Sequence, residues 1–202
     1  MGKNKHIHLA LALAVIFAIS RIPGLMPENF SAAYALAYCA GLYFPGAMAW
    51  WFPLGAMFVT DIVLNIFYYH VSAITPFILA VYLCYGLLVL LGKKFRQSNS
   101  FIYLLSGGIL GALLFYIITN TISWLADPGY QKNLAGWIQA LTTGLPGYPP
   151  TWVFFKNTLL SGGLFTGLFV GSMKIAEATS EKEETEETEE GETEPASEKT
   201  AS

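Results

Sequence analysis

Long apolar runs, each about the length of a membrane-spanning helix, fill the first 176 residues of this chain. A helix needs about twenty mostly apolar residues to cross a hydrocarbon core of roughly 30 Å. The runs that come close to this length are residues 6–22, 32–47, 48–67, 74–91, 101–119 and 151–173. The sequence therefore predicts an all-α fold, a polytopic bundle of about six transmembrane helices in a lipid bilayer.

The apolar stretch at residues 32–67 is too long to be one span. As a single helix it would be about 54 Å long, far more than the thickness of the hydrocarbon core. It is therefore predicted to form two spans with a turn between them. Pro45-Gly46 and Pro53 both offer such a turn, and the sequence does not choose between them.

The acidic residues are concentrated in the last 26 positions. Residues 177–202 hold eleven of the fourteen acids, and the body keeps only Glu28, Asp61 and Asp127. A segment rich in Glu, Thr, Ser and Lys, without an aromatic residue, cannot bury enough apolar area to order itself. We therefore predict a transmembrane domain at residues 1–176 and a disordered acidic tail at residues 177–202.

Lysine and arginine near the ends of the predicted spans indicate the orientation, because cytoplasmic ends carry more of them. The side of the N-terminus has Lys3, Lys5, Lys93, Lys94, Arg96 and Lys174, and the other side has Arg21, Lys132 and Lys156. Both termini are therefore predicted to be cytoplasmic. The longer connections, residues 21–31, 68–73 and 120–150, then face outward, and such segments often carry binding sites.

The connection at residues 120–150 contains a short amphipathic pattern. Leu134, Trp137, Ile138 and Leu141 recur at helical spacing. The pattern predicts a short helix outside the membrane core. Two interpretations stay open: an interfacial helix that anchors the loop, and a lid over a cavity.

Two ionisable residues inside predicted spans, Asp61 and Lys156, are the first candidates for a site, because charges in the membrane are costly. Both lie roughly 8–9 Å below the outer surface, so they could pair. The other polar and aromatic candidates at similar outer levels are Asn65, Asn120, Trp124 and Asn157. Together they predict a substrate-binding cavity in the outer half. The alternative is a buried ion pair that fixes helix register.

Cys84 lies about ten residues into the span at residues 74–91, between Tyr82 and Tyr85. A thiol there can be a soft metal ligand. A buried cysteine can also be only a small apolar residue, and both interpretations stay open.

Small residues recur every fourth position on two predicted spans. The first span has Ala10, Ala14 and Ala18, and the last has Gly163, Gly167 and Gly171. Such stripes let helix backbones approach closely, either within the bundle or against a partner protein. The first span also has the outline of a signal peptide, but its alanine stripe favours a retained helix.

Several functional classes lack their motifs. The chain has no phosphate-binding glycine loop, no His-Glu-x-x-His and no Gly-x-Ser-x-Gly elbow. Asp61 and Glu28 have no carboxylate neighbour for acid–base work, and there is no basic patch for nucleic acid. We therefore expect neither an enzyme nor a resident cofactor.

A series of short motifs resembles those of a group of small, poorly characterised bacterial membrane proteins. The motifs are Arg21-Ile-Pro, Pro27-Glu-Asn-Phe-Ser31, Ala35-Leu-Ala37, Gly41-x-Tyr-Phe44, Thr60-Asp61, Pro76-Phe77 with Tyr82, and Phe155-Lys-Asn-Thr-Leu-Leu160. They extend over most of residues 18–172. In span count, size and loop layout the group is similar to the substrate-binding S components of energy-coupling factor (ECF) vitamin transporters.

The resemblance implies a protein of the bacterial inner (cytoplasmic) membrane that captures a vitamin-like small molecule in an outward-facing cavity. In S components a first-span Ala-x-x-x-Ala stripe docks the coupling subunit, and Ala10, Ala14 and Ala18 match that pattern. Partner ATPases supply the energy. In a solitary branch that transports cobalamin, a membrane cysteine ligates the corrinoid cobalt, and here that role would fall to Cys84. A non-transporting membrane scaffold remains the alternative function.

Overall fold

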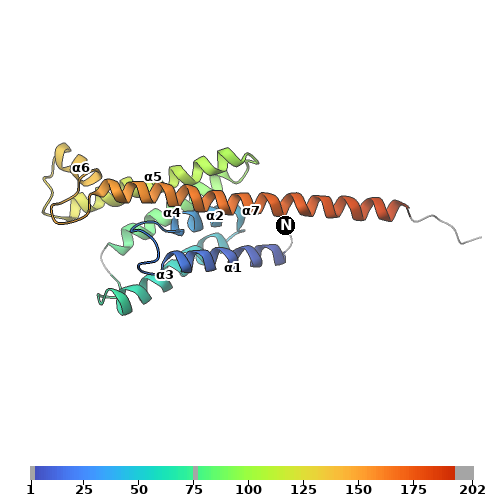
Figure 1. Cartoon of the computed structure of the whole chain (residues 1–202), viewed down its shortest axis with the longest axis horizontal. Helices are drawn as coiled ribbons and strands as arrows, with labels where there is room; N and C mark the ends of the chain where they lie inside the picture. Colours follow the sequence, from blue (N-terminus) through green and yellow to red (C-terminus); the bar gives the residue numbers. More distant parts are fainter. Residues whose placement is uncertain (1–2, 75–76, 194–202) are drawn as a thin grey trace, which may run out of the picture.

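The computed structural model describes the backbone of residues 3–74 and 77–193, and the side chains of residues 11–74 and 77–179. Apart from turns and loops, these residues form only helices, as the sequence predicts. The elements are α1 (Lys3–Ser20), α2 (Ala33–Tyr43), α3 (Met48–Val63), the π-helical turn η1 (Leu64–Tyr68), α4 (Ile78–Phe95), α5 (Phe101–Ala126), α6 (Leu134–Leu141) and α7 (Thr151–Thr193). The long helices run along one common axis (Figure 1).

Four helical segments are long and apolar enough to cross a membrane. They are Met48–Tyr68, Ile78–Phe95, Phe101–Ala126 and Thr151–Thr179. They indicate a multi-pass membrane protein. The prediction of six spans is confirmed only in part, because the described apolar part of α1, Leu11–Ser20, is shorter and α2 has only 11 residues.

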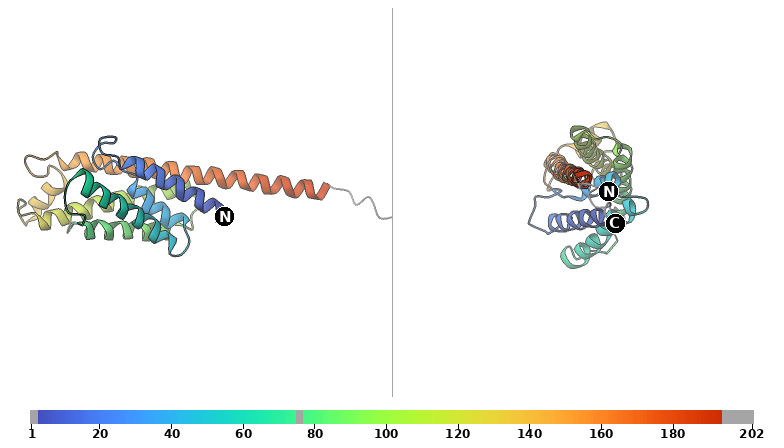
Figure 2. Two further views of the ribbon diagram at one scale, coloured as in Figure 1. Left: turned by 90° about the horizontal axis from the view of Figure 1, so that it is seen from below. Right: turned by 90° about the vertical axis from the view of Figure 1, so that its right-hand side faces the viewer.

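The two ends of the bundle differ. α6 and its flanking loops lie at one end, and the start of α1 and the extension of α7 lie at the other (Figure 1). We name the end with α6 the outer end, as the charge pattern predicts, and the opposite one the inner end. Seen end-on, α1 and α3 lie on one side of the bundle, with α5 and α7 on the other (Figure 2).

The helices follow the apolar runs, but several bounds differ: α4 covers Ile78–Phe95 where the sequence predicts residues 74–91, and α2 ends at Tyr43 instead of residue 47. The turn between α2 and α3 uses Pro45-Gly46, where Gly46 has a φ of +50°, and Pro53 lies inside α3. α5 continues to Ala126, beyond the predicted end at residue 119. The backbone of α7 is helical as far as Thr193, whereas the sequence predicts disorder from residue 177. Glu and Lys are good helix formers, and a preceding membrane helix removes the cost of nucleation. Residues 194–202 lie outside the described part of the chain.

α2 forms the centre of the bundle. Its residues from Ala33 to Leu42 are all buried, and it contacts α1, α3, α4, α5 and α7. Eleven residues make a helix of only about 16 Å, roughly half the thickness of a hydrocarbon core. α2 is therefore a buried central helix of the bundle rather than a membrane span.

Both ends of α2 are satisfied by other parts of the chain. At its inner end the Arg96 guanidinium donates hydrogen bonds to the carbonyls of Leu42 (2.7 Å) and Phe44. A cation there also complements the negative end of the helix dipole. At its outer end the backbone N–H of Ala32 donates to the Ser20 hydroxyl at 3.0 Å. These bonds are needed because helix ends leave unpaired backbone groups that are costly to bury.

α2 crosses α4 at two glycines. A Cβ added to Gly41 would lie 2.2 Å from the Val89 carbonyl oxygen, and one added to Gly92 would lie 2.1 Å from the Tyr38 carbonyl oxygen. In both cases the obstacle is backbone, which cannot rotate away. Glycine at both positions is therefore required for this close approach.

The glycine stripe on α7 packs less tightly than its spacing predicts. A Cβ on Gly163, Gly167 or Gly171 would meet α5 side chains at 3.5–3.8 Å, an ordinary contact distance. The close contact uses Gly162 instead, where a Cβ would lie 2.6 Å from that of Ala112. The stripe therefore belongs to the looser edge of the α5–α7 contact.

We expect Gly41→Ala and Gly92→Ala to lower the free energy of unfolding by about 1–3 kcal/mol each, because each added methyl group pushes two helix backbones apart. The matched control is Gly55→Ala on α3, where a Cβ meets no atom within 4 Å. The control should leave stability unchanged or raise it slightly, because alanine favours helix. Thermal unfolding in detergent measures all three, and equal melting of Gly41→Ala and Gly55→Ala would contradict the account.

Candidate binding site

A cavity of about 650 Å³ opens at the outer end of the bundle, beside the start of α2. Its walls come from residues 20–31, the first turn of α2, η1, the start of α4 and the last turns of α5. The polar and aromatic lining residues are Ser20, Arg21, Glu28, Asn29, Phe30, Ser31, Tyr34, Tyr68, Tyr69, Phe77, Tyr85, Phe115, Thr119, Asn120 and Ser123. The volume falls within the range of roughly 300–1,000 Å³ that is common for small-molecule sites.

The segment between α1 and α2 shapes the cavity. Because α2 is short and begins inside the bundle, residues 21–32 must fold down to reach it. Gly24 (φ +79°) and Asn29 (φ +60°) provide the turns, since both residue types tolerate positive φ. The buried Asn157 of α7 donates from Nδ2 to the Glu28 carbonyl at 2.9 Å and so fixes this segment.

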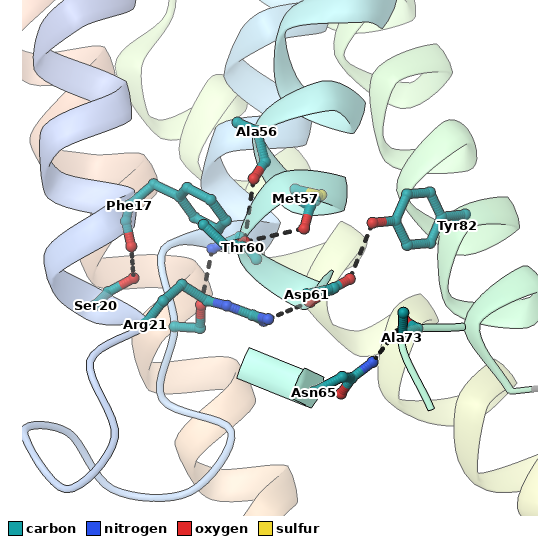
Figure 3. Close-up of polar contacts among 12 residues, drawn as sticks. Phe17, Ser20, Arg21, Ala56, Met57, Thr60, Asp61, Asn65, Ala73 and Tyr82 are labelled. Carbon is teal, nitrogen blue, oxygen red and sulfur yellow. Dashed lines mark hydrogen bonds and ion pairs between the residues drawn. The ribbon is translucent and has the colours of Figure 1, made fainter. Parts of the chain in front are cut away.

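An ion pair inside the outer half joins three helices (Figure 3). Arg21 lies just after α1. Its Nη2 donates a hydrogen bond to Oδ1 of Asp61 on α3, and the two side chains form an ion pair. The Tyr82 hydroxyl of α4 donates to Asp61 Oδ2 at 3.0 Å. The Arg21 and Asp61 side chains are only 22% and 16% exposed, so the pair is partly shielded from solvent. Arg21 also lines the cavity, whereas Asp61 lies behind it.

The prediction that Asp61 could pair with Lys156 was wrong, because Asp61 pairs with Arg21. Lys156 lies on the exposed face of α7, and its ammonium group sits 6.0 Å from the centre of the Trp152 ring, one turn nearer the outer end. A lysine in such a place can extend its charge towards the membrane surface. Sequence position gives depth along a helix, but here it did not give the direction in which the side chain points.

The predicted binding residues divide into one that lines the cavity and others that hold its surroundings. Asn120 lines the cavity and donates to the Tyr116 carbonyl at 2.8 Å. Asn65 donates to the Ala73 carbonyl at 3.1 Å. Trp124 donates from Nε1 to the Gln131 carbonyl at 2.8 Å. Asn65 and Trp124 thus fasten outer loops, as Asn157 does for residues 21–32.

Cys84 is buried in α4 and is not part of the cavity lining. Among the residues that the structure describes, no cluster of three or more His, Cys, Asp or Glu side chains could hold a metal ion. The metal-ligand interpretation of Cys84 therefore still rests on the sequence alone.

The sequence analysis missed the aromatic wall of the cavity. Tyr34 and Phe115 meet edge-to-face with ring centroids 4.9 Å apart. Tyr85 stacks on Phe115 at 5.3 Å with an interplanar angle of 25°. One signal was available: Phe115, Thr119 and Ser123 recur every fourth residue, which places all three on one face of α5.

The alanine stripe of α1 lies outside this site. The Ala10 side chain is beyond the described ones, Ala14 is half-buried and Ala18 is exposed. Leu11, Val15 and Ile19 are exposed as well, so one side of α1 is apolar and uncovered by the rest of the chain.

The chain matches the model of a known protein family. The model described as "Family of unknown function (DUF6580)" matches residues 2–185. No curated protein matches the chain.

The Arg21–Asp61 pair should contribute to stability. We expect Asp61→Asn to lower the free energy of unfolding by about 1–3 kcal/mol, because it leaves a shielded guanidinium without its charged partner. Denaturant unfolding of Asp61→Asn, Arg21→Gln and the double variant forms a double-mutant cycle.

We expect the double variant to lose less free energy of unfolding than the sum of the losses in the two single variants. Lys156→Gln is the control, because it removes a cation at similar depth from an exposed face. Additive effects of the two single changes would contradict the ion pair.

Proposed function

The chain belongs to DUF6580, a family of unknown function, and from this premise we propose that it is a membrane substrate-binding protein. It captures a vitamin-like small molecule in the outer cavity and serves its transport, in the manner of an S component of an ECF transporter. The proposal includes no catalysis and places the protein in the bacterial cytoplasmic membrane.

The cavity is the observation that carries this proposal. Helical bundles normally pack their interiors densely, with few voids larger than a water molecule. An open cavity of about 650 Å³, lined by aromatic rings and by many polar groups, has the volume of a small-molecule site. A scaffold whose ion pair and small residues serve only packing and docking has no need of such a hollow.

The energy for transport comes, in this proposal, from partner proteins. The sequence has no phosphate-binding loop of its own, and the resemblance implies a coupling subunit with ATPases. The uncovered apolar side of α1, which includes Ala18, is the surface that such a subunit would contact.

Cobalamin is one candidate ligand, with Cys84 as the cobalt ligand. The position of Cys84 away from the cavity lining favours ligands that need no thiol. We therefore propose the broader class of vitamin-like molecules and keep cobalamin as one member to be tested.

Filling the cavity should abolish ligand binding without unfolding the protein. Ser123→Phe places a ring in the cavity, because Ser123 lines it. Leu125→Phe adds the same ring type two residues later, at an exposed position. The measurement is thermal unfolding of each purified protein in detergent with a panel of vitamins, together with native mass spectrometry of molecules that co-purify.

A ligand at 100 times its dissociation constant should stabilise the wild type and Leu125→Phe by about 2.7 kcal/mol, and Ser123→Phe much less. Equal stabilisation of both variants would place the ligand outside the cavity and contradict the proposed site, and no ligand for the wild type would favour the scaffold. For cobalamin, the absorption spectrum is also recorded with the wild type and with Cys84→Ala. Ligation of cobalt by Cys84 predicts a spectral shift with the wild type that is absent with Cys84→Ala.

A further inference from the structure

We infer that the cavity selects a planar aromatic molecule that carries a carboxylate, with the carboxylate at Arg21 and the ring against Phe115 and Tyr85. This inference rests on the proposed function and narrows its ligand to a chemical class.

Of the two charged residues that line the cavity, Arg21 is the one that can bind an anionic group. Among the described lining residues, Arg21 carries the positive charge and Glu28 carries the negative charge. Glu28 lies on an exposed part of the segment between α1 and α2. Asp61 neutralises Arg21 from behind and does not line the cavity. A ligand therefore meets the guanidinium without meeting the Asp61 carboxylate.

The guanidinium keeps donors that the protein does not use. Arginine has five N–H donors, and Asp61 Oδ1 accepts from Nη2. Nε of Arg21 is buried and has no hydrogen-bond partner. Because Nε is buried and Nη2 is held by Asp61, the exposed part of the side chain offers a ligand the Nη1 donors. A carboxylate accepts such charge-assisted hydrogen bonds more strongly than a neutral group does.

The start of α2 adds to this preference. Ser31 and Tyr34, which flank the N-terminus of α2, line the cavity together with Arg21. The backbone N–H groups of Ala32 and Ala33 already donate to the hydroxyls of Ser20 and Ser31. The contribution of α2 is therefore the positive end of its helix dipole, which lies beside the same space and favours an anion.

The aromatic residues that line the cavity are the reason to expect an aromatic ring in the ligand. Tyr34, Phe115 and Tyr85 form one contiguous group of rings at the cavity. Tyr85 is only 5% exposed, and its ring stacks on that of Phe115. An aromatic ring of a ligand can pack against such rings in stacked or edge-to-face geometry.

Three probes separate the two parts of the inference. 2-Naphthoate has both the fused ring and the carboxylate, 2-naphthamide has the ring without the charge, and cyclohexanecarboxylate has the charge without the aromatic ring. Isothermal titration calorimetry of the full chain in detergent gives the three dissociation constants. We expect 2-naphthoate to bind at least about tenfold more tightly than either of the others.

Variants then locate the carboxylate. Arg21→Lys keeps the positive charge but removes the Nη1 donors, and should weaken 2-naphthoate about tenfold while 2-naphthamide is unchanged. Lys156→Gln removes a cation outside the cavity and should change neither constant. If Arg21→Lys does not fold, the comparison of the acid with the amide in the wild type still decides the inference.

The outcomes also separate this inference from the proposed function. Equal affinity for the acid and the amide overturns the inference, and the proposed function stands if Ser123→Phe abolishes binding. If no probe binds but a vitamin of the panel does, the ligand class is wrong and the binding function stands. If neither the probes nor the panel bind, both proposals fail.

Discussion

The short central helix α2 is the constraint on which the rest of the structure depends. A helix of about 16 Å cannot cross a hydrocarbon core of roughly 30 Å, so both of its ends lie within the protein. Arg96 satisfies the inner end, and the Ser20 hydroxyl helps to satisfy the outer one. The glycines at its crossing with α4 let the backbones of these two helices approach closely. Beyond its outer end, the same shortness leaves the space that becomes the cavity.

Arg21 joins the cavity to the architecture of the bundle. It follows α1, pairs with Asp61 of α3, and through that carboxylate is linked to Tyr82 of α4. It also lines the cavity. A ligand that engages Arg21 therefore acts on the contact that ties the end of α1 to the bundle. Because α1 also carries the uncovered apolar side, the proposed ligand and the proposed partner would both act on this helix.

Apolar length and the proline–glycine breaks made the helices predictable from the sequence, and with them residues 21–31 as the connection between α1 and α2. The predictions that failed concern the direction in which a side chain points around the helix axis, not its position along the helix. Asp61 was placed at the right depth, yet its partner is Arg21, because Lys156 points away from the bundle. The spacing of Gly163, Gly167 and Gly171 likewise predicted a close contact that the structure makes at Gly162.

The central claim is that a cavity beside the start of α2 opens to the outside of the membrane. Labelling of Ser123→Cys by a membrane-impermeant maleimide tests it in intact cells, with the wild type as background because Cys39 and Cys84 are buried. Ser98→Cys, beside the start of α5 at the inner end, is the matched control. The account predicts that Ser123→Cys is labelled in intact cells and Ser98→Cys only after permeabilisation. Labelling in the reverse order, or an inert Ser123→Cys in the folded protein, would contradict it.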